Sequence, residues 1–252
     1  MTAGISCRCD GAVLRIVLDR PDKLNALNTP MLTELRSRIQ DGGAHEAVRV
    51  ITLTGAGRAF CSGGDLSGKD TGGAAVAAGD VVGAITASPK PVVAAVRGAA
   101  AGYGCALALS CDLVVAARSA FFQLAFAKVG LMTDGGTSAL LSAAVGRARA
   151  ARMALLGEKI SAALAFEWGM VSHLVDDDAF DDEFATVVHT LATGPTLSYG
   201  WIKRALRAAT LSELCETQSI EAEGQEALGR SEDFREGVRA FRDRRPPQFR
   251  GL

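Results

Sequence analysis

The sequence predicts an α/β core followed by a helical appendage. Through about Val175, short apolar runs typical of buried strands alternate with stretches whose apolar residues recur at helical spacing. After Val175 the periodic stretches are helical only. The chain has 252 residues, of which 48% are hydrophobic, so it can bury one large core. We therefore expect an α/β core over residues 1–194 and a helical region over residues 195–252.

Five runs are predicted as strands. The clearest is the run from Val92 to Val96, because it is wholly apolar and follows Pro89 and Pro91. The run at 12–18 alternates around Arg15, as a half-buried strand does. The remaining predicted strands cover residues 48–53, 113–116 and 171–175.

Helices are predicted between and after these strands. Thr29 and Pro30 indicate a helix start, with a capping hydroxyl followed by a proline in the first turn. Ser161 and Ser231 are expected to cap two later helices. Further helices are expected at 80–87, 138–145, 147–156, 161–168, 179–192, 197–209 and 211–228, and after Ser231. Residues 66–79 are rich in small residues and are interpreted as a mobile flap, or else as a short loop without a gating role.

Composition excludes several classes of function. The net charge of −1 gives no basic excess for nucleic acid or an anionic membrane. No apolar run reaches membrane-spanning length, and residues 1–10 lack a signal core, so a cytoplasmic protein is expected. The six scattered cysteines favour reduced thiols, and no cluster of metal ligands is expected.

Two glycine-rich turns follow predicted strands. One runs from Gly55 to Leu66. The other is a small-residue turn from Arg97 to Ala101, after which Gly102, Tyr103 and Gly104 open a second apolar run. A strand, a glycine turn and a buried helix place free backbone N–H groups at the helix start, where they favour negative charge. Two such turns can supply two donors to one developing oxyanion. The alternative from spacing alone is two ordinary strand-end turns.

Five motifs resemble the crotonase, or enoyl-CoA hydratase/isomerase, superfamily over essentially the full length. They lie at 20–27, 59–66, 98–112, 130–137 and 235–249. The resemblance implies a spiral of ββα units with C-terminal helices that form a homotrimer, often paired into a hexamer. It also implies an acyl-CoA thioester substrate, with coenzyme A as part of the substrate and no separate cofactor.

The resemblance assigns an oxyanion hole to the backbone N–H groups of Gly64 and Tyr103. It implies that the backbone near Ala26 contacts the CoA nucleotide with Lys23 close by, although Lys23 could equally be a solvated loop charge. The other residues expected to bind substrate or CoA are Ser62, Gly63, Asp65, Leu66, Gly102 and Phe126, with Phe126 as a wall of the acyl pocket. Asp65 could instead brace its loop, and Arg242, Arg244 and Arg245 could reach CoA phosphates or form a solvated basic tail.

Asp134 is the predicted catalytic base. From local sequence alone, an aspartate before the 138–145 helix would be interpreted as its N-cap. Several isomerases of the resembling superfamily place a catalytic aspartate at the matching position. At the positions that the resemblance assigns to the two glutamates of hydratases, this chain has Ala106 and Phe126. Hydration needs groups that activate water and deliver a proton, so a single carboxylate favours proton relocation.

The preferred hypothesis is therefore an acyl-CoA isomerase in which Asp134 transfers a proton through a (di)enolate. The likeness is greatest to the phenylacetate-pathway isomerase branch, although Thr133 and Arg97 depart from its usual proline and asparagine. The alternatives are an enoyl-CoA hydratase and an inactive acyl-CoA-binding trimer. A dinucleotide-binding enzyme is disfavoured, since no Gly-x-Gly-x-x-Gly follows a strand.

Overall fold

A six-stranded sheet forms the centre of the molecule. The computed structural model describes residues 4–65 and 71–252. The spatial order is β1 (Ile5–Asp10), β2 (Val13–Leu18), β3 (Val50–Gly55), β4 (Val92–Val96), β6 (Leu113–Ala117) and β9 (His173–Val175). β1 is antiparallel to β2, and each later pair of neighbours is parallel. Because parallel neighbours need long crossovers, the intervening segments are free to carry helices.

A second, three-stranded sheet lies beside the first. It consists of β5 (Ala99–Ala101), β7 (Phe121–Gln123) and β8 (Lys159–Ser161), with β5 parallel and β8 antiparallel to β7. β5 also pairs at Ala100 with Cys61 in the loop after β3. The second sheet therefore joins the two glycine-rich turns predicted from the sequence.

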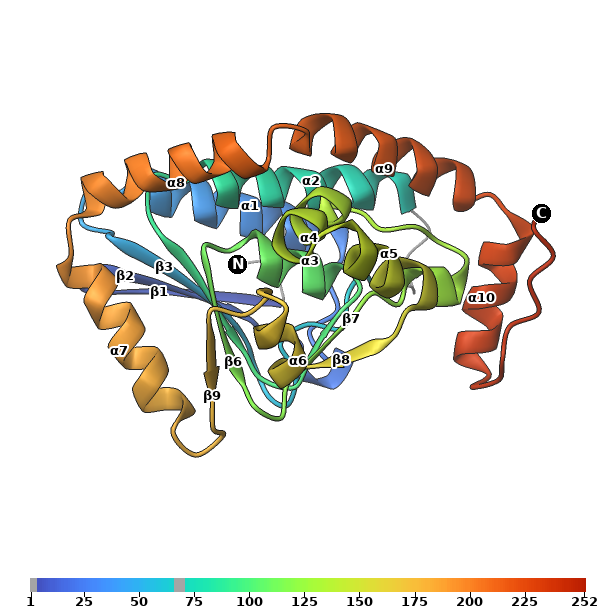
Figure 1. Cartoon of the computed structure of the whole chain (residues 1–252), viewed down its shortest axis with the longest axis horizontal. Helices are drawn as coiled ribbons and strands as arrows, with labels where there is room; N and C mark the ends of the chain where they lie inside the picture. The colour runs from blue at the N-terminus through green and yellow to red at the C-terminus, as the bar shows by residue number, and fades with distance from the viewer. Residues whose placement is uncertain (1–3, 66–70) are drawn as a thin grey trace.

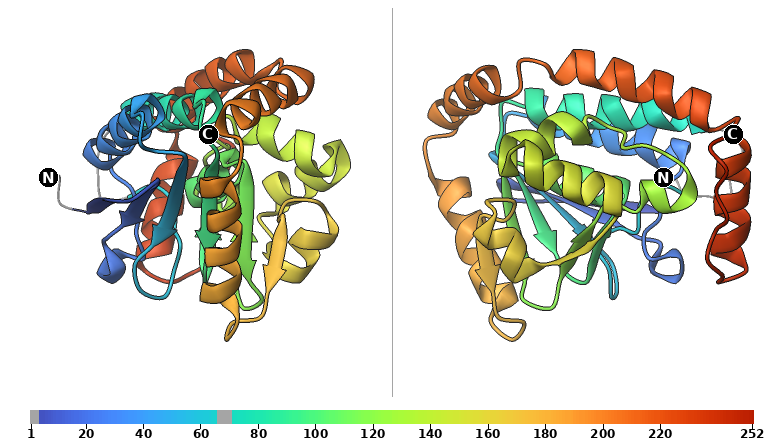
Figure 2. Two further views of the ribbon diagram at one scale, coloured as in Figure 1. Left: turned by 90° about the vertical axis from the view of Figure 1, so that its left-hand side faces the viewer. Right: turned by 45° about the vertical axis from the view of Figure 1, so that its right-hand side comes forward.

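Helices cover both faces of the large sheet (Figure 1). Their bounds are α1 (Thr29–Ala44), α2 (Thr71–Ala87), α3 (Tyr103–Ser110), α4 (Thr137–Val145), α5 (Arg147–Leu156), α6 (Ala162–Glu167), α7 (Phe180–Thr193), α8 (Thr196–Thr210), α9 (Leu214–Leu228) and α10 (Glu232–Arg242), with short 3-10 helices η1 (Pro21–Lys23) and η2 (Phe126–Val129). α8 and α9 run along the outer side of α1 and α2, whereas α10 turns away at the end of the molecule (Figures 1 and 2).

The alternation along each strand divides the core into two clusters. Ile51, Leu53 and Ala94 are on the sheet face that packs with α1, α2 and α3. Val50 and Val93 point to the opposite face, where Phe180 and Val188 of α7 cover them. Successive strand residues point to opposite faces, so a sheet covered on both sides has strands that are apolar throughout.

Most predicted elements are confirmed. The five predicted strands correspond to β2, β3, β4, β6 and β9, and the predicted helices after residue 137 are all present as α4 to α10. The hydroxyls of Ser161 and Ser231 accept hydrogen bonds from the N–H groups of Leu164 and Phe234, at 3.2 and 3.0 Å, as their capping roles require.

Three sequence interpretations are wrong. Residues 71–79, assigned to the flap, form the first half of α2, while residues 66–70 lie outside the described part of the chain. The cap of α1 is Asn28, whose side chain accepts from the N–H of Met31, whereas Thr29 is already helical. Residues 99–101, assigned to a turn, are strand β5. Two of these errors have a tertiary cause: α2 is held by packing on α1 and α9, and β5 is held by pairing with β7 and with Cys61.

Candidate active site

The loop after β3 is joined to the loop after β2 by backbone hydrogen bonds. Leu27 donates to the carbonyl of Gly63, and Asp65 donates to the carbonyl of Leu27, both at 2.8 Å. Ser62 donates its N–H to Leu24 at 2.9 Å and its hydroxyl to the carbonyl of Lys23 at 3.3 Å. The structure thus brings together five of the predicted binding residues: Lys23, Ala26, Ser62, Gly63 and Asp65.

Arg20 and Asn25 hold these two loops in place. The guanidinium of Arg20 donates to the Asp65 carboxylate at 3.0 Å and to the carbonyl of Ala26 at 2.9 Å. Asn25 is fully buried, and its amide donates to the carbonyls of Ala56 and Ala59 at 2.9 and 2.8 Å. Asp65 therefore braces its loop, while Lys23 is exposed beside it. The Ala26 carbonyl retains a second lone pair for a ligand donor.

The second glycine turn lies against the first. Gly102 has φ 52° and ψ −128°, a conformation that a side chain strongly disfavours. A Cβ atom on Gly63 would lie 3.4 Å from the N atom of Tyr103, so the backbones of the two turns approach closely. Among the described residues, neither the N–H of Gly64 nor that of Tyr103 has a hydrogen-bond acceptor. Two free donors on converging turns match the arrangement that an oxyanion hole needs.

The Asp134 carboxyl group is buried behind Tyr103. A Cβ atom on Gly135 would meet the Tyr103 ring at 2.6 Å, and the Tyr103 hydroxyl donates to the Ala78 carbonyl at 2.9 Å. Asp134 Oδ2 accepts from the side chain of Gln225 at 3.3 Å, whereas its Oδ1 is buried without a partner. Burial, followed by the charge of Glu221, raises the pKa of Asp134 to about 8. A carboxyl group with this pKa can both accept and return a proton near neutral pH.

Asp134 does not cap the following helix with its side chain. α4 begins after Gly136, and the backbone carbonyl of Asp134 accepts from the N–H of Thr137 at 3.1 Å. The capping role belongs to Glu221 of α9, which is 1% exposed and accepts from the N–H groups of Gly136 and Ser138 at 2.5 and 2.9 Å. The alternative interpretation of Asp134 as an N-cap is therefore wrong.

Sequence analysis did not identify Glu221 and Gln225. They share a helical stripe with Leu214 and Gln218, since the four residues are separated by intervals of four, three and four. Leu214, Glu221 and Gln225 are all buried. The spacing was a signal that this face of α9 packs inward, but polar side chains at these positions gave no apolar pattern to detect.

The remaining predicted site residues are placed as follows. Phe126 begins η2 with its side chain in the main core, and Ala106 is fully buried on α3. Neither Ala106, Phe126 nor its neighbour Ala125 can transfer a proton. Leu66 lies outside the described residues. Among the described residues, no group of three His, Cys, Asp or Glu side chains is arranged to hold a metal ion.

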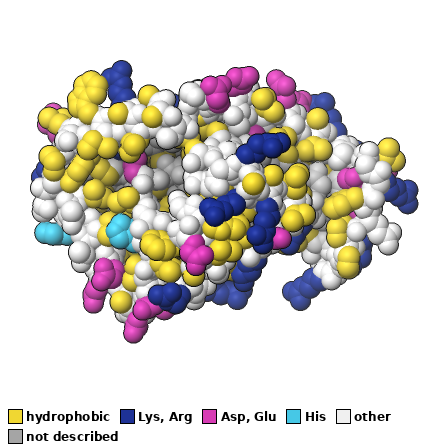
Figure 3. Space-filling view, viewed as in Figure 1, with side chains coloured by type: hydrophobic (Ala, Val, Ile, Leu, Met, Phe, Trp, Pro, Cys, Tyr) yellow, Lys and Arg dark blue, Asp and Glu magenta, His cyan; other side chains and the backbone are white. Residues whose placement is uncertain are grey.

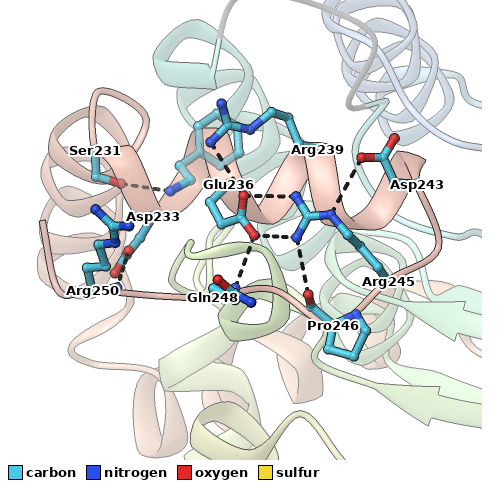
Figure 4. A network of polar contacts seen from close by, with 10 residues as sticks. Ser231, Asp233, Glu236, Arg239, Asp243, Arg245, Pro246, Gln248 and Arg250 are labelled. Atoms are coloured by element: carbon cyan, nitrogen blue, oxygen red, sulfur yellow. Dashed lines mark hydrogen bonds and ion pairs between the residues drawn. The ribbon is translucent and has the colours of Figure 1, made fainter.

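Arg245 of the tail is engaged within its own segment (Figure 4). Arg245 makes two hydrogen bonds to the Glu236 carboxylate, at 2.5 and 3.0 Å, and these lower the pKa of Glu236 to about 2. Arg245 is therefore committed to the tail rather than held free for a phosphate.

Thr133 and Arg97, the two departures from the usual residues of the isomerase branch, also have partners. Thr133 bonds the Ser138 hydroxyl at 2.7 Å, and Arg97 pairs with Asp181 at 2.9 Å.

A groove of about 740 Å³ runs along α2 between α1 and α9. It reaches Gly135, next to Asp134, but its lining does not include Gly64 or Tyr103.

None of the helices in the described part of the chain is long and apolar enough to cross a membrane.

The fold is that of solved enoyl-CoA hydratase structures. A structure described as an enoyl-CoA hydratase from Mycobacterium avium subsp. paratuberculosis K-10 superposes with a TM-score of 0.95 at 42% identity, covering 98% of this chain and 99% of that one. This match confirms the predicted crotonase-like α/β fold with C-terminal helices.

The sequence comparisons then identify the family. The model of the enoyl-CoA hydratase/isomerase family matches residues 8–251, and the chain belongs to this family of enzymes. It is 42% identical to 1,2-epoxyphenylacetyl-CoA isomerase of Escherichia coli K12, over 95% of both proteins. It is also 43% identical to a probable enoyl-CoA hydratase of Rhodobacter capsulatus, over 94% of this chain and 93% of the relative. These two similarities do not separate isomerase from hydratase.

Proposed function

We propose that this protein is an acyl-CoA isomerase that moves a double bond, or isomerises a ring-epoxide acyl-CoA, by proton transfer through Asp134. The observation that carries the proposal is the Asp134 carboxyl group, buried behind Tyr103 with its pKa raised to about 8. Phe126 and Ala106 supply no second acid or base. Glu221 is the other carboxylate beside Asp134, but both of its oxygens accept backbone N–H groups, so it is not available to activate water.

In the proposed reaction the thioester oxygen is held by the N–H groups of Gly64 and Tyr103. Ionised Asp134 removes a proton that is acidified by the carbonyl group. The electrons move into the carbonyl to give an enolate or dienolate, and the two N–H groups stabilise its negative charge. Protonated Asp134 then returns the proton to another carbon of the conjugated system, which restores the thioester carbonyl and leaves Asp134 ionised. Ala26, Gly63 and Ser62 would position the CoA portion.

A paired turnover assay tests this proposal. One arm supplies a β,γ-unsaturated acyl-CoA and measures the conjugated isomer, and a parallel sample supplies the epoxide of phenylacetyl-CoA. The other arm supplies the conjugated compound and measures the hydroxyacyl product. We expect isomerisation with little hydration, and we expect Asp134→Asn to lose isomerisation by at least about 100-fold, the usual contribution of a proton-transfer group.

Two outcomes contradict the proposal. Hydration that survives in Asp134→Asn would identify the protein as a hydratase with another water-activating group. The Rhodobacter capsulatus relative is named a probable enoyl-CoA hydratase. Binding of acyl-CoA without turnover in either arm would identify an inactive binding protein.

We also propose that the protein forms a homotrimer, alone or paired into a hexamer. Support comes from α8, on which Leu197, Trp201 and Leu206 are 86%, 68% and 60% exposed. The space-filling view shows hydrophobic side chains gathered over α8 (Figure 3). A contiguous exposed apolar surface of this kind is typical of an interface between proteins.

A further inference from the structure

α9 places two buried polar side chains against the loop that carries Asp134. Glu221 and Gln225 are 1% and 2% exposed, and they lie one helical turn apart on the face that packs toward α4. Close approach is possible because Gly224 has no side chain: a Cβ atom there would lie 2.0 Å from the sulfur of Met132. Buried polar side chains are costly unless they are hydrogen-bonded, so their partners reveal their role.

Glu221 holds the start of α4 with both carboxylate oxygens. Oε2 accepts from Gly136 at 2.5 Å, and Oε1 accepts from Ser138 at 2.9 Å. Two N–H donors and the positive end of the α4 dipole stabilise the ionised carboxylate at this place. The Glu221 carboxylate is therefore held against Gly136, which follows Asp134 by two residues in the sequence.

Gln225 holds the carboxyl group itself. Its Nε2 donates to the carbonyl of Met132 at 2.6 Å and to Oδ2 of Asp134 at 3.3 Å. Because the Met132 carbonyl can only accept, the orientation of the amide group is fixed. Gln225 Oε1 and Asp134 Oδ1 are then the two buried side-chain atoms without partners among the described residues. A proton on Oδ1, or a substrate group with a donor, is what these two atoms lack.

We propose that Glu221 and Gln225 are positioning residues for Asp134. In this proposal, which rests on the proposed function, Gln225 orients the carboxyl group and favours its ionised form. Glu221 anchors the loop and disfavours the ionised form through its own charge.

The directions of the two effects follow from the surrounding charges. Among the residues that the structure describes, the ionisable groups around Asp134 are the Glu221 carboxylate on α9 and the Tyr103 phenol on α3. The phenol stays neutral because burial and the Asp134 charge raise its pKa. Removing the negative charge of Glu221 should make Asp134 easier to ionise. Removing the hydrogen bond from Gln225 should make Asp134 harder to ionise, since that bond stabilises the carboxylate.

The test is the pH dependence of kcat/KM for isomerisation in wild type, Glu221→Gln and Gln225→Leu. We expect the rising limb to move to lower pH in Glu221→Gln and to higher pH in Gln225→Leu, each by about one unit, the smaller end of the range for such perturbations. We expect kcat in Gln225→Leu to fall about tenfold while KM changes little, because the carboxyl group loses its orientation.

Two controls separate positioning from folding. Gln218→Leu removes a comparable hydrogen bond on the same helix face, from its side chain to the Gly79 carbonyl at 3.2 Å, and should leave the limb in place. Glu221→Asp keeps the negative charge and should keep the limb near its wild-type position. Limbs that move in the same direction in Glu221→Gln and Gln225→Leu, or that do not move in either, would overturn the proposal.

A readout independent of turnover separates this proposal from the proposed function. The carboxyl carbon signal of Asp134, assigned by its loss in Asp134→Asn, can be titrated by NMR in each variant. Opposite shifts of that titration in an enzyme without isomerase activity would uphold the role of α9 and reject the isomerase assignment. An unmoved titration in an active isomerase would do the reverse.

Discussion

At the residue scale, the site depends on a carboxyl group kept in an environment that disfavours its charge. Burial raises the pKa of Asp134 to about 8, and the nearby Glu221 charge acts in the same direction. An ordinary aspartate would be ionised at neutral pH and would be a weaker base. Burial thus destabilises the ionised form of Asp134 in the folded protein, and the resulting pKa suits a base that transfers protons near neutral pH.

This environment predicts a pH-dependent difference in stability between wild type and Asp134→Asn. The pKa of Asp134 is about 8 in the folded protein and near 3.8 in the unfolded chain, so between these values the folded state binds the proton more tightly. The stability that Asp134 contributes is therefore present below about pH 4 and lost as pH rises through 8. An asparagine does not titrate, and its amide can donate to Gln225 Oε1.

Calorimetry at several pH values checks this prediction. The Tm of Asp134→Asn relative to wild type should increase steadily between about pH 4 and pH 8 and level off above that. A Tm difference that is the same at pH 5 and pH 8 would mean that Asp134 is not buried as the structure shows. Asp41→Asn, at an exposed position on α1, serves as the control and should show no comparable trend.

At the element scale, α8 is attached to the core by an ion pair between buried Lys203 and partly exposed Asp112. The ammonium group of Lys203 lies 2.6 Å from the Asp112 carboxylate and donates to the carbonyl of Lys90 at 2.7 Å. The same carboxylate accepts from the N–H of Val92 at 2.7 Å, at the start of β4. Helix α8 otherwise presents mostly exposed side chains, and this pair links its middle to the sheet, while Arg49 beside β3 donates to the Thr196 hydroxyl at its start at 2.9 Å.

Lys203→Met should destabilise the protein by roughly 3 kcal/mol, the lower end of the range for breaking a buried ion pair, because Asp112 is still 26% exposed. The loss arises from the Asp112 charge that is left without its partner. Denaturant unfolding measures the change. Arg204→Met, at the adjacent exposed position, should change stability by less than about 0.5 kcal/mol. Equal effects of the two substitutions would contradict the anchoring role.

At the scale of the whole molecule, the apolar surface of α8 is expected to be covered by other copies of the chain. Trp201→Asp places a charge in the middle of that surface, where Trp201 is 68% exposed in the single chain. We expect light scattering to show a trimer or hexamer for wild type and mainly monomer for Trp201→Asp, since a buried unpaired charge opposes association. His189→Asp, on the exposed side of α7, should leave the assembly intact. A monomeric wild type would reject the proposed assembly.

The predictability of the fold followed the local strength of each pattern. The run of Val92 to Val96 was predicted correctly because five consecutive apolar residues have few alternatives to a buried strand. β1 was missed, since five of its six residues are exposed and its alternation is weak. α2 was half missed because glycine and alanine carry little local preference for a packed helix, and its contacts with α1 and α9 decide its structure.

The sequence by itself determined the α/β class, the order of five of the nine strands in the described chain, the family and the candidate base Asp134. These follow from periodicity and from motifs that are local in the chain. The tertiary structure alone decided what surrounds Asp134, because Glu221 and Gln225 lie 87 and 91 residues further along the chain and are polar residues of a helix. Only folding brings α9 against that loop, and burial there, followed by the Glu221 charge, raises the pKa of Asp134 to a value suited to proton transfer.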